Sequence, residues 1–348
     1  MSRANPAQPA RLEAKSLVLD RISGSLELVE SAMRDQLGAD AELVGALGEH
    51  VLSSGGKRLR PALVLLAAEL CGYTGPRRIQ VAAAVELLHT ATLLHDDVVD
   101  VSTLRRGRPS ANAIWGNRRA VLGGDFLYAR ASSMIVEDGD LGILEIFANT
   151  IRAMAEGELL QLQRSFDTSM TEAQYYAVID RKSASLLSAA CEAGSILGGV
   201  TRAERRRVSE FGRELGLAFQ LRDDALDYEA GAEVLGKPPH TDLREGKITL
   251  PLLLTLKRST AAEREQIAGV LKIAAQVADL SLAGSDSLPE LDLAPVLDWV
   301  ERYRGIADTV RRAEEHVARA AAAIAPFPDG AAKQALLSSA AFAVARDR

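Results

Sequence analysis

Apolar residues recur at the spacing of one helical face along most of the chain. The i, i+3, i+4, i+7 pattern is clearest in four segments, Leu43–Leu52, Val81–Val101, Tyr175–Leu197 and Glu204–Tyr228. The strong helix formers Ala, Leu, Glu and Arg dominate from about Leu17 onward, and alternating β-branched stretches are nearly absent. The pattern therefore predicts an all-α protein, a single large helical bundle of roughly a dozen helices.

Breaker residues and changes in pattern set the expected boundaries. Clusters of Gly, Pro, Asp and Ser separate the predicted helices, and Arg106-Gly107-Arg108-Pro109 is one such break. Residues from about 275 to 295 predict a loop between late helices. Residues 1–15 carry two prolines among mixed polar residues, which indicates a disordered tail. No linker or shift in composition divides residues 16–348, so we expect them to form one domain.

Composition narrows the class of protein further. The 348 residues are 47% apolar and carry a net charge of −6, which is a poor match for a nucleic-acid-binding protein. Cys71 and Cys191, neither in a CxxC pair, cannot make a disulfide framework or a thiolate zinc site, which fits a reducing cytoplasm. No apolar run approaches the ~18 to 20 residues that span a bilayer. We therefore expect a soluble cytoplasmic protein without a membrane anchor.

The acidic pattern DDxxD occurs twice, each time after a long apolar helical segment. The copies are Asp96–Asp100 and Asp223–Asp227. On a helix, the first and last aspartates of each copy share a face, where their like charges repel and require positive compensation. Carboxylate oxygens without His or Cys favour Mg²⁺, which also takes phosphate oxygens as ligands. The pattern predicts two acidic walls holding a phosphate or diphosphate; solvated acidic helix ends are the alternative.

Basic residues suited to a diphosphate lie nearby in the sequence. The segment Gly55–Pro61 joins a flexible turn to three cations, and Arg105-Arg106-Gly107 follows the first acidic copy by five residues. His89 lies seven residues before Asp96, on the same helical face. Taken singly, these residues also fit a surface basic turn and a capped core histidine.

Together these motifs resemble the trans-polyprenyl diphosphate synthases, most closely the long-chain type that makes octaprenyl, solanesyl or decaprenyl diphosphate. The segments that carry the resemblance are 55–61, 86–100, 105–107, 123–127, 157–158, 219–228 and 242–247. The resemblance implies the isoprenoid synthase bundle with a central cavity. It also implies Mg²⁺-dependent head-to-tail condensation of isopentenyl diphosphate onto farnesyl or geranylgeranyl diphosphate, a homodimer, and a product used for quinones or a related lipid.

Site residues follow from the resemblance, position by position. The metal motifs correspond to Asp96, Asp97, Asp100, Asp223, Asp224 and Asp227, among which Asp96, Asp100 and Asp223 are the expected direct ligands. The resemblance implies about three magnesium ions when the allylic diphosphate is bound. Lys57, Arg60, His89 and Arg106 correspond to the isopentenyl diphosphate pocket, and Arg105, Lys182, Lys237 and Lys247 to cations that face the allylic diphosphate. Lys182, Ser183 and Gln220 correspond to the catalytic residues beside the reacting carbons.

Two positions depart from the family pattern. Ser183 stands where the family usually has Thr, but the hydroxyl group is retained. His240-Thr241 replaces the more common Gly-Asp or Gly-Thr before Asp242, so whether Asp242 joins the second metal site stays open.

The expected product length depends on the helix before the first acidic copy. Ala91 and Thr92 are small, which favours a deep tunnel and products longer than geranylgeranyl diphosphate. Phe147 is a candidate for the tunnel floor, with ordinary core packing as the alternative. A shorter-chain synthase making farnesyl or geranylgeranyl diphosphate stays open.

Three other protein classes deserve comparison. A terpene cyclase also uses DDxxD but stabilises carbocations with aromatic faces, and this chain is only 4% aromatic. A head-to-head synthase does not need the basic turn. A non-catalytic subunit of a heteromeric synthase should have lost motif residues, whereas both acidic copies and the cations are complete here.

Overall fold

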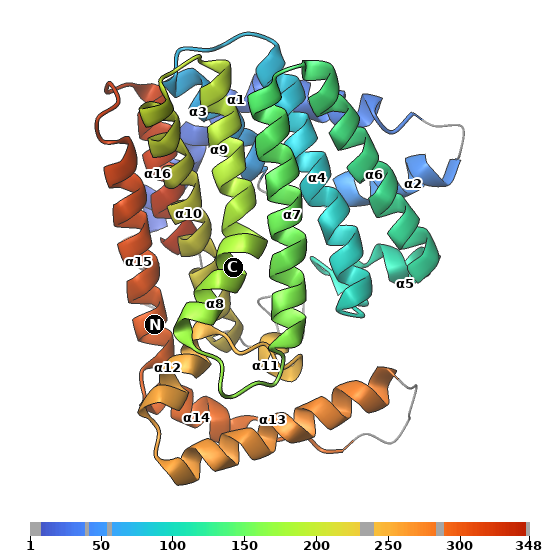
Figure 1. The fold of residues 1–348 in the computed structure, drawn as a ribbon, viewed down its shortest axis with the longest axis vertical. Coiled ribbons are helices and arrows are strands. Elements are labelled where there is room, and N and C mark those ends of the chain that lie inside the picture. Colours follow the sequence, from blue (N-terminus) through green and yellow to red (C-terminus); the bar gives the residue numbers. More distant parts are fainter. Residues whose placement is uncertain (1–7, 39–41, 54–57, 230–239, 283–288, 346–348) are drawn as a thin grey trace.

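The chain folds into a bundle of long α-helices, with further helices lying across one end (Figure 1). The computed structural model describes residues 8–38, 42–53, 58–229, 240–282 and 289–345. In chain order the helices are α1 (Gln8–Asp35), α2 (Glu42–Ser53), α3 (Leu59–Leu70), α4 (Arg77–Val99), α5 (Ala111–Trp115), α6 (Asn117–Asp138), α7 (Leu141–Gln163), α8 (Glu172–Ile179), the π-helix η1 (Asp180–Ala184), α9 (Ser185–Leu197), α10 (Arg202–Glu229), α11 (Thr241–Arg244), α12 (Leu250–Arg258), α13 (Ala261–Leu282), α14 (Ala294–Arg302), α15 (Gly305–Ile324) and α16 (Ala331–Ala345). The predicted all-α class is confirmed.

The centre of the bundle is built on helices that are apolar on more than one face. In α3, every residue from Pro61 to Ala68 is buried. A helix that is apolar all round needs neighbours on every side, and α3 packs against α4, α9 and α16. The long helix α10 packs between α9 and α15.

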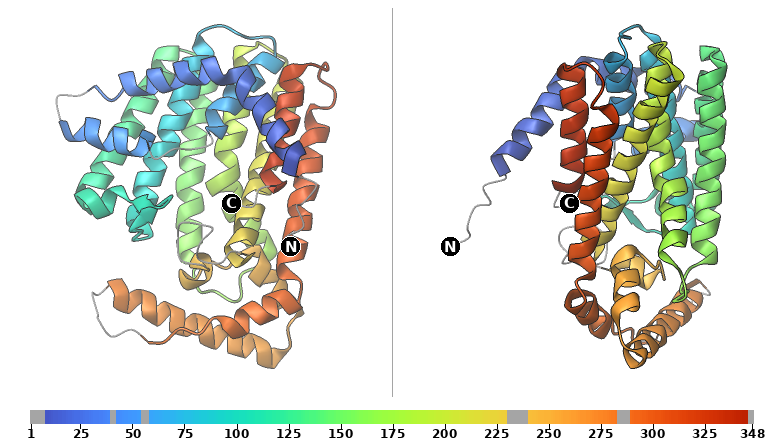
Figure 2. Two further views of the ribbon diagram at one scale, coloured as in Figure 1. Left: turned by 180° about the vertical axis from the view of Figure 1, so that it is seen from behind. Right: turned by 60° about the vertical axis from the view of Figure 1, so that its left-hand side comes forward.

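Two apolar clusters form the core, and α10 contributes to both. The first cluster takes Phe211 and Leu215 of α10, together with side chains of α3, α4, α6 and α9. The second takes Leu217 and Leu221, together with side chains of α8, α12, α13 and α14. Figure 2 shows α13 and α14 crossing the lower end of the bundle. The second half of α10, which carries the second acidic motif, is therefore held by the lower cluster.

A two-stranded hairpin interrupts the helices after the first acidic motif. Strand β1 (Leu104–Arg105) pairs antiparallel with β2 (Arg108–Pro109). The two loop residues, Arg106 and Gly107, have φ values of 53° and 75°. Positive φ at both loop positions is typical of the tight hairpin turn whose twist matches the strands. The sequence predicted a break here but not the strands.

Element boundaries differ from the expected ones in two places. α13 extends to Leu282, so the expected loop from about 275 was wrong over residues 275–282. α1 begins at Gln8, inside the range 1–15 that we expected to be a tail, and residues 1–7 lie outside the described residues. In the part of the chain that the structure describes, no helix has both the length and the apolar character needed to cross a membrane.

Candidate active site

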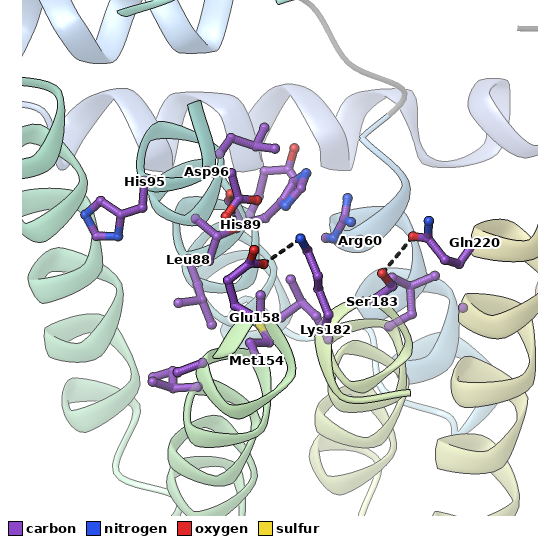
Figure 3. Close-up of a pocket in the computed structure, with 18 of the residues that line it drawn as sticks. Arg60, Leu88, His89, His95, Asp96, Met154, Glu158, Lys182, Ser183 and Gln220 are labelled. Atoms are coloured by element: carbon purple, nitrogen blue, oxygen red, sulfur yellow. Dashed lines mark hydrogen bonds and ion pairs between the residues drawn. The ribbon is translucent and has the colours of Figure 1, made fainter. Parts of the chain in front are cut away.

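A cavity of about 1240 Å³ enters the bundle between α4, α7, η1 and α10. Asp96, near the end of α4, and Asp223, near the end of α10, both line it. The structure thus brings the two acidic motifs to one cavity, although they lie far apart in the sequence. Figure 3 shows Asp96 and His89 on one wall, Gln220 on the facing helix, and Glu158 and Lys182 between them.

The three aspartates of the first motif have different surroundings. Asp96 lines the cavity, and burial raises its pKa to about 6 although the nearby Lys182 lowers it. The buried carboxylate of Asp97 accepts a hydrogen bond of 2.7 Å from Arg105 Nε, and the ion pair brings Arg105 Nη2 to 2.6 Å from the same oxygen. Asp100 faces Lys247, whose Nζ lies 3.4 Å from both carboxylate oxygens. Asp96 is therefore the aspartate of this motif that faces the cavity.

The second motif divides in a similar way. Asp223 lines the main cavity. Asp224 lines a smaller adjoining pocket of about 110 Å³ together with Asp242 and Lys247. Asp227 accepts hydrogen bonds from the backbone N–H groups of Thr241 and Asp242, at 3.1 and 3.2 Å. Burial, and then the charge of Asp242, raise the pKa of both Asp224 and Asp227. Asp242 thus lies beside both of these aspartates.

A π-helical turn places two predicted catalytic residues in the cavity wall. η1 contains Lys182 and Ser183, and such turns often occur at functional sites. Two glycines let neighbouring helices approach η1 closely. A Cβ on Gly157 of α7 would lie 2.7 Å from the backbone nitrogen of Lys182, and a Cβ on Gly216 of α10 would lie 2.5 Å from Ala184 Cα. Backbones this close hold η1 firmly between α7 and α10.

Polar contacts join η1 to its two neighbours. Lys182 Nζ lies 2.5 Å from Glu158 of α7. Ser183 Oγ donates a hydrogen bond of 2.7 Å to Gln220 Oε1 of α10 (Figure 3). The sequence missed the ion pair, because residue spacing does not show which cation a carboxylate on another helix will meet.

Cations gather at one end of the cavity. Arg60, His89 and Arg106 all line it, together with Arg58 and Glu86. Burial lowers the pKa of His89 well below 6.5, and the positive charges of Arg60 and Arg106 lower it further. The imidazole is therefore neutral near pH 7 and can serve phosphate only as an N–H donor. This end of the cavity suits a diphosphate that is held by charge and hydrogen bonds.

The remaining predicted diphosphate-binding cations do not all lie in the main cavity. Arg105 lines the cavity beside Asp97, whereas Lys247 lines the smaller pocket. Lys57 and Lys237 lie outside the described residues.

The residues expected to set product length lie in three different places. Leu88 and Thr92 line the cavity, whereas Ala91 is buried in the core and is absent from the described residues that line it. Phe147 lines a small apolar void. Leu186 of α9 lines both the cavity and this void, so it separates them.

The acidic groups fit magnesium chemistry without forming a complete cage. Within the described ranges, no three His, Cys, Asp or Glu side chains come together closely enough to hold a metal ion. Mg²⁺ often takes only one or two carboxylates and fills its other positions with water and phosphate oxygens. Asp96 and Asp223, on two helices that border one cavity, can each supply a carboxylate to ions that a diphosphate completes.

The comparisons with known proteins agree with this geometry. The sequence profile described as "Polyprenyl synthetase" matches residues 41–282. This chain belongs to the polyprenyl synthetase family. It is therefore a prenyltransferase of a magnesium-dependent family, and the predicted resemblance is confirmed.

Several similar members of this family are long-chain enzymes. The chain is 42% identical to octaprenyl diphosphate synthase of Escherichia coli (strain K12) over 92% of this chain and 95% of that one. A polyprenyl synthase structure from Caulobacter crescentus, complexed with calcium and isoprenyl diphosphate, is 40% identical with a TM-score of 0.86 over 96% and 98% of the two chains. A decaprenyl diphosphate synthase structure from Rhodobacter capsulatus is 36% identical with a TM-score of 0.87 over 96% and 99%.

Proposed function

We propose that this polyprenyl synthetase makes a long all-trans polyprenyl diphosphate by adding isopentenyl diphosphate units to farnesyl or geranylgeranyl diphosphate. One observation carries the proposal: a single cavity joins two aspartates, a cationic end and an apolar wall. The aspartates suit the diphosphate that leaves, the cations suit the one that stays, and the apolar wall suits the growing chain.

The two diphosphates need different surroundings, because only one of them ionises. The allylic diphosphate belongs beside Asp96, Asp223 and Lys182. Magnesium, about three ions in this proposal, stabilises the leaving diphosphate there when bound. Isopentenyl diphosphate belongs at the cationic end, with Arg60, His89 and Arg106, and with Lys57 by sequence. Cations and a neutral N–H donor position it without promoting its departure.

The polar residues of η1 lie where the allylic carbon should react. In this proposal Ser183 and Gln220 face the developing allylic cation with oxygen atoms, and Lys182 draws the departing diphosphate away from it. The double bond of isopentenyl diphosphate then attacks, and the released diphosphate accepts the proton lost from the new chain.

The apolar wall favours a long product. Leu88, Thr92 and Leu186 continue the cavity away from the acidic end, and a chain growing past them would approach Phe147. The long-chain names of the relatives support the same reading over a shorter-chain synthase. Of the described residues that line the cavity, the Phe and Tyr rings are Phe219 and Tyr128, few for a cyclase that stabilises cations by ring faces.

We also propose that the chain works as a homodimer in the cytoplasm. Exposed apolar side chains on α6 and α7, among them Leu122, Val136 and Leu141, offer a surface that a second copy could cover. Sedimentation analysis of the purified chain tests this: a mass of two chains supports a dimer, and a single-chain mass contradicts it.

The assay uses the purified chain alone with Mg²⁺, radiolabelled isopentenyl diphosphate and farnesyl diphosphate. The proposal expects label in products longer than geranylgeranyl diphosphate, and no incorporation when Mg²⁺ is chelated. Short products would favour the shorter-chain alternative. Cyclised hydrocarbon without label would indicate a cyclase, and complete inactivity would indicate a subunit that needs a partner.

A further inference from the structure

A continuous chain of hydrogen bonds runs from α8 through α10 to the π-helical turn. Tyr175 Oη donates to Asp224 Oδ2 at 2.5 Å. Gln220 Nε2 donates to Asp224 Oδ1 at 2.7 Å, and Ser183 Oγ donates to Gln220 Oε1 at 2.7 Å. Tyr175 and Asp224 are each only 2% exposed, so the far end of the chain is closed to solvent.

The order of donors and acceptors in this chain fixes the orientation of Gln220. The two carboxyl oxygens of Asp224 accept from Tyr175 and from Gln220, so the amide turns its NH₂ group toward Asp224. Its oxygen then faces Ser183, which uses its only O–H hydrogen on that oxygen. What Ser183 can offer to a reacting group is therefore a pair of oxygen lone pairs, which suit a developing positive charge.

Asp224 differs from its neighbour Asp223 in position as well as in bonding. Asp223 lines the main cavity, whereas Asp224 lines the smaller pocket behind Ser183 and Gln220. Both oxygens of Asp224 already accept hydrogen bonds from the protein. Asp223 therefore faces the main cavity, whereas Asp224 binds protein side chains behind the cavity wall.

We infer that Tyr175 and Asp224 are positioning residues, which hold Gln220 and through it Ser183 for prenyl transfer, and that Asp224 is not a direct magnesium ligand. The inference rests on the proposed function and assigns Asp224 a different role from the one that the DDxxD pattern predicts. Tyr175 lies outside every motif singled out in the sequence, and it reaches the site through this hydrogen bond and as part of the lining of the smaller pocket.

The first test compares Tyr175→Phe with Tyr176→Phe. The two rings are adjacent, with centroids 5.5 Å apart, and the Tyr176 hydroxyl has no part in the chain. We expect Y175F to lower kcat about tenfold, which corresponds to the loss of one hydrogen bond, with both KM values nearly unchanged. Y176F should keep the wild-type kcat. Equal kcat values for Y175F and wild type would overturn the inference.

The second test reverses the polarity of one hydrogen bond. In Gln220→Glu, a carboxyl oxygen replaces the donor NH₂ group and faces the carboxyl group of Asp224, so kcat should fall about tenfold. Adding Asp224→Asn restores a donor at position 224, while position 220 keeps acceptors toward both neighbours. The double variant should therefore be more active than the product of the two single effects predicts. Purely additive losses, or a Q220E variant as active as wild type, would count against the chain.

The third test measures metal binding without turnover. Mg²⁺ with inorganic diphosphate should raise Tm, because a ligand of the folded state stabilises it. The rise should persist in Y175F and D224N and be lost in Asp223→Asn. Loss of the rise in D224N would make Asp224 a metal ligand and overturn that part of the inference. A wild-type chain that transfers no prenyl group would instead refute the proposed function.

Discussion

The carboxylate of Glu86 and the guanidinium of Arg58 form an ion pair of 3.2 Å at the cationic end of the cavity. Glu86 is only 5% exposed, and its Oε2 accepts no hydrogen bond from any described residue. A buried carboxylate inside an anion-binding pocket is costly unless it holds the cations in place. Its negative charge also raises the pKa of Arg60 and Arg106, against the lowering effect of burial.

The first prediction concerns this carboxylate. Glu86→Gln should raise KM for isopentenyl diphosphate about tenfold and leave KM for the allylic substrate unchanged, because the arginines lose a charged partner. Glu30→Gln is the matched control: Glu30 also pairs with Arg58, at 3.2 Å, but comes from α1. Steady-state kinetics, with each substrate varied in turn, give the two KM values. Tighter isopentenyl diphosphate binding in E86Q would show that Glu86 merely repels the substrate.

The second prediction concerns stability at low pH. His89 stays neutral in the folded chain, because burial and nearby cations hold its pKa well below 6.5. In the unfolded chain it takes up a proton as the pH falls below about 6.5, so its contribution to stability is lost on acidification. Between about pH 7 and pH 5, the free energy of unfolding should therefore fall more steeply for wild type than for His89→Gln. Urea unfolding at several pH values measures this free energy. Parallel pH profiles for the two proteins would contradict a neutral His89 in the folded chain.

The third prediction concerns product length. Leu186→Ala should open the cavity into the void beside Phe147 and lengthen the product, as should Phe147→Ala. Leu187→Ala is the control, since Leu187 lines the cavity but is absent from the described residues around the void. Thr92→Phe should shorten the product, because Thr92 lines the cavity. Chromatography of dephosphorylated products gives the lengths; identical distributions for L186A and L187A would refute the proposed wall.

The fourth prediction concerns the close approach of α7 to η1. Gly157→Ala would place a Cβ 2.7 Å from the Lys182 backbone nitrogen, so it should cost about 1–3 kcal/mol of stability and reduce kcat. Gly269→Ala, in α13 with no described atom within 4 Å of the new Cβ, should instead gain up to about 1 kcal/mol. Thermal unfolding of both variants checks the contrast. Equal Tm changes would mean that the close approach has no energetic role.

The sequence predicted those features of the fold and site that depend on residue spacing alone. Helical periodicity predicted the all-α bundle, and the two DDxxD copies pointed to Asp96 and Asp223, which line one cavity. Roles that depend on neighbours from distant elements could not be predicted. The motif does not show that Asp97 pairs with Arg105 or Asp224 with Tyr175, because tertiary packing decides which side chains meet these carboxylates.

Two backbone features were also beyond the sequence. The π-helical turn that carries Lys182 has the composition of an ordinary helix, and it forms where Gly157 and Gly216 admit neighbouring backbones. The hairpin strands are too short to show any alternation, although Arg106-Gly107 marked the turn.

The most direct test of the central claim is a crystal structure of the chain with Mg²⁺ and a non-hydrolysable thiolo analogue of farnesyl diphosphate. The account predicts that the diphosphate lies between Asp96 and Asp223, bridged to both carboxylates by metal, with the prenyl tail directed toward Leu186. A diphosphate bound at the cationic end, or metal bound to only one of the two acidic motifs, would contradict it.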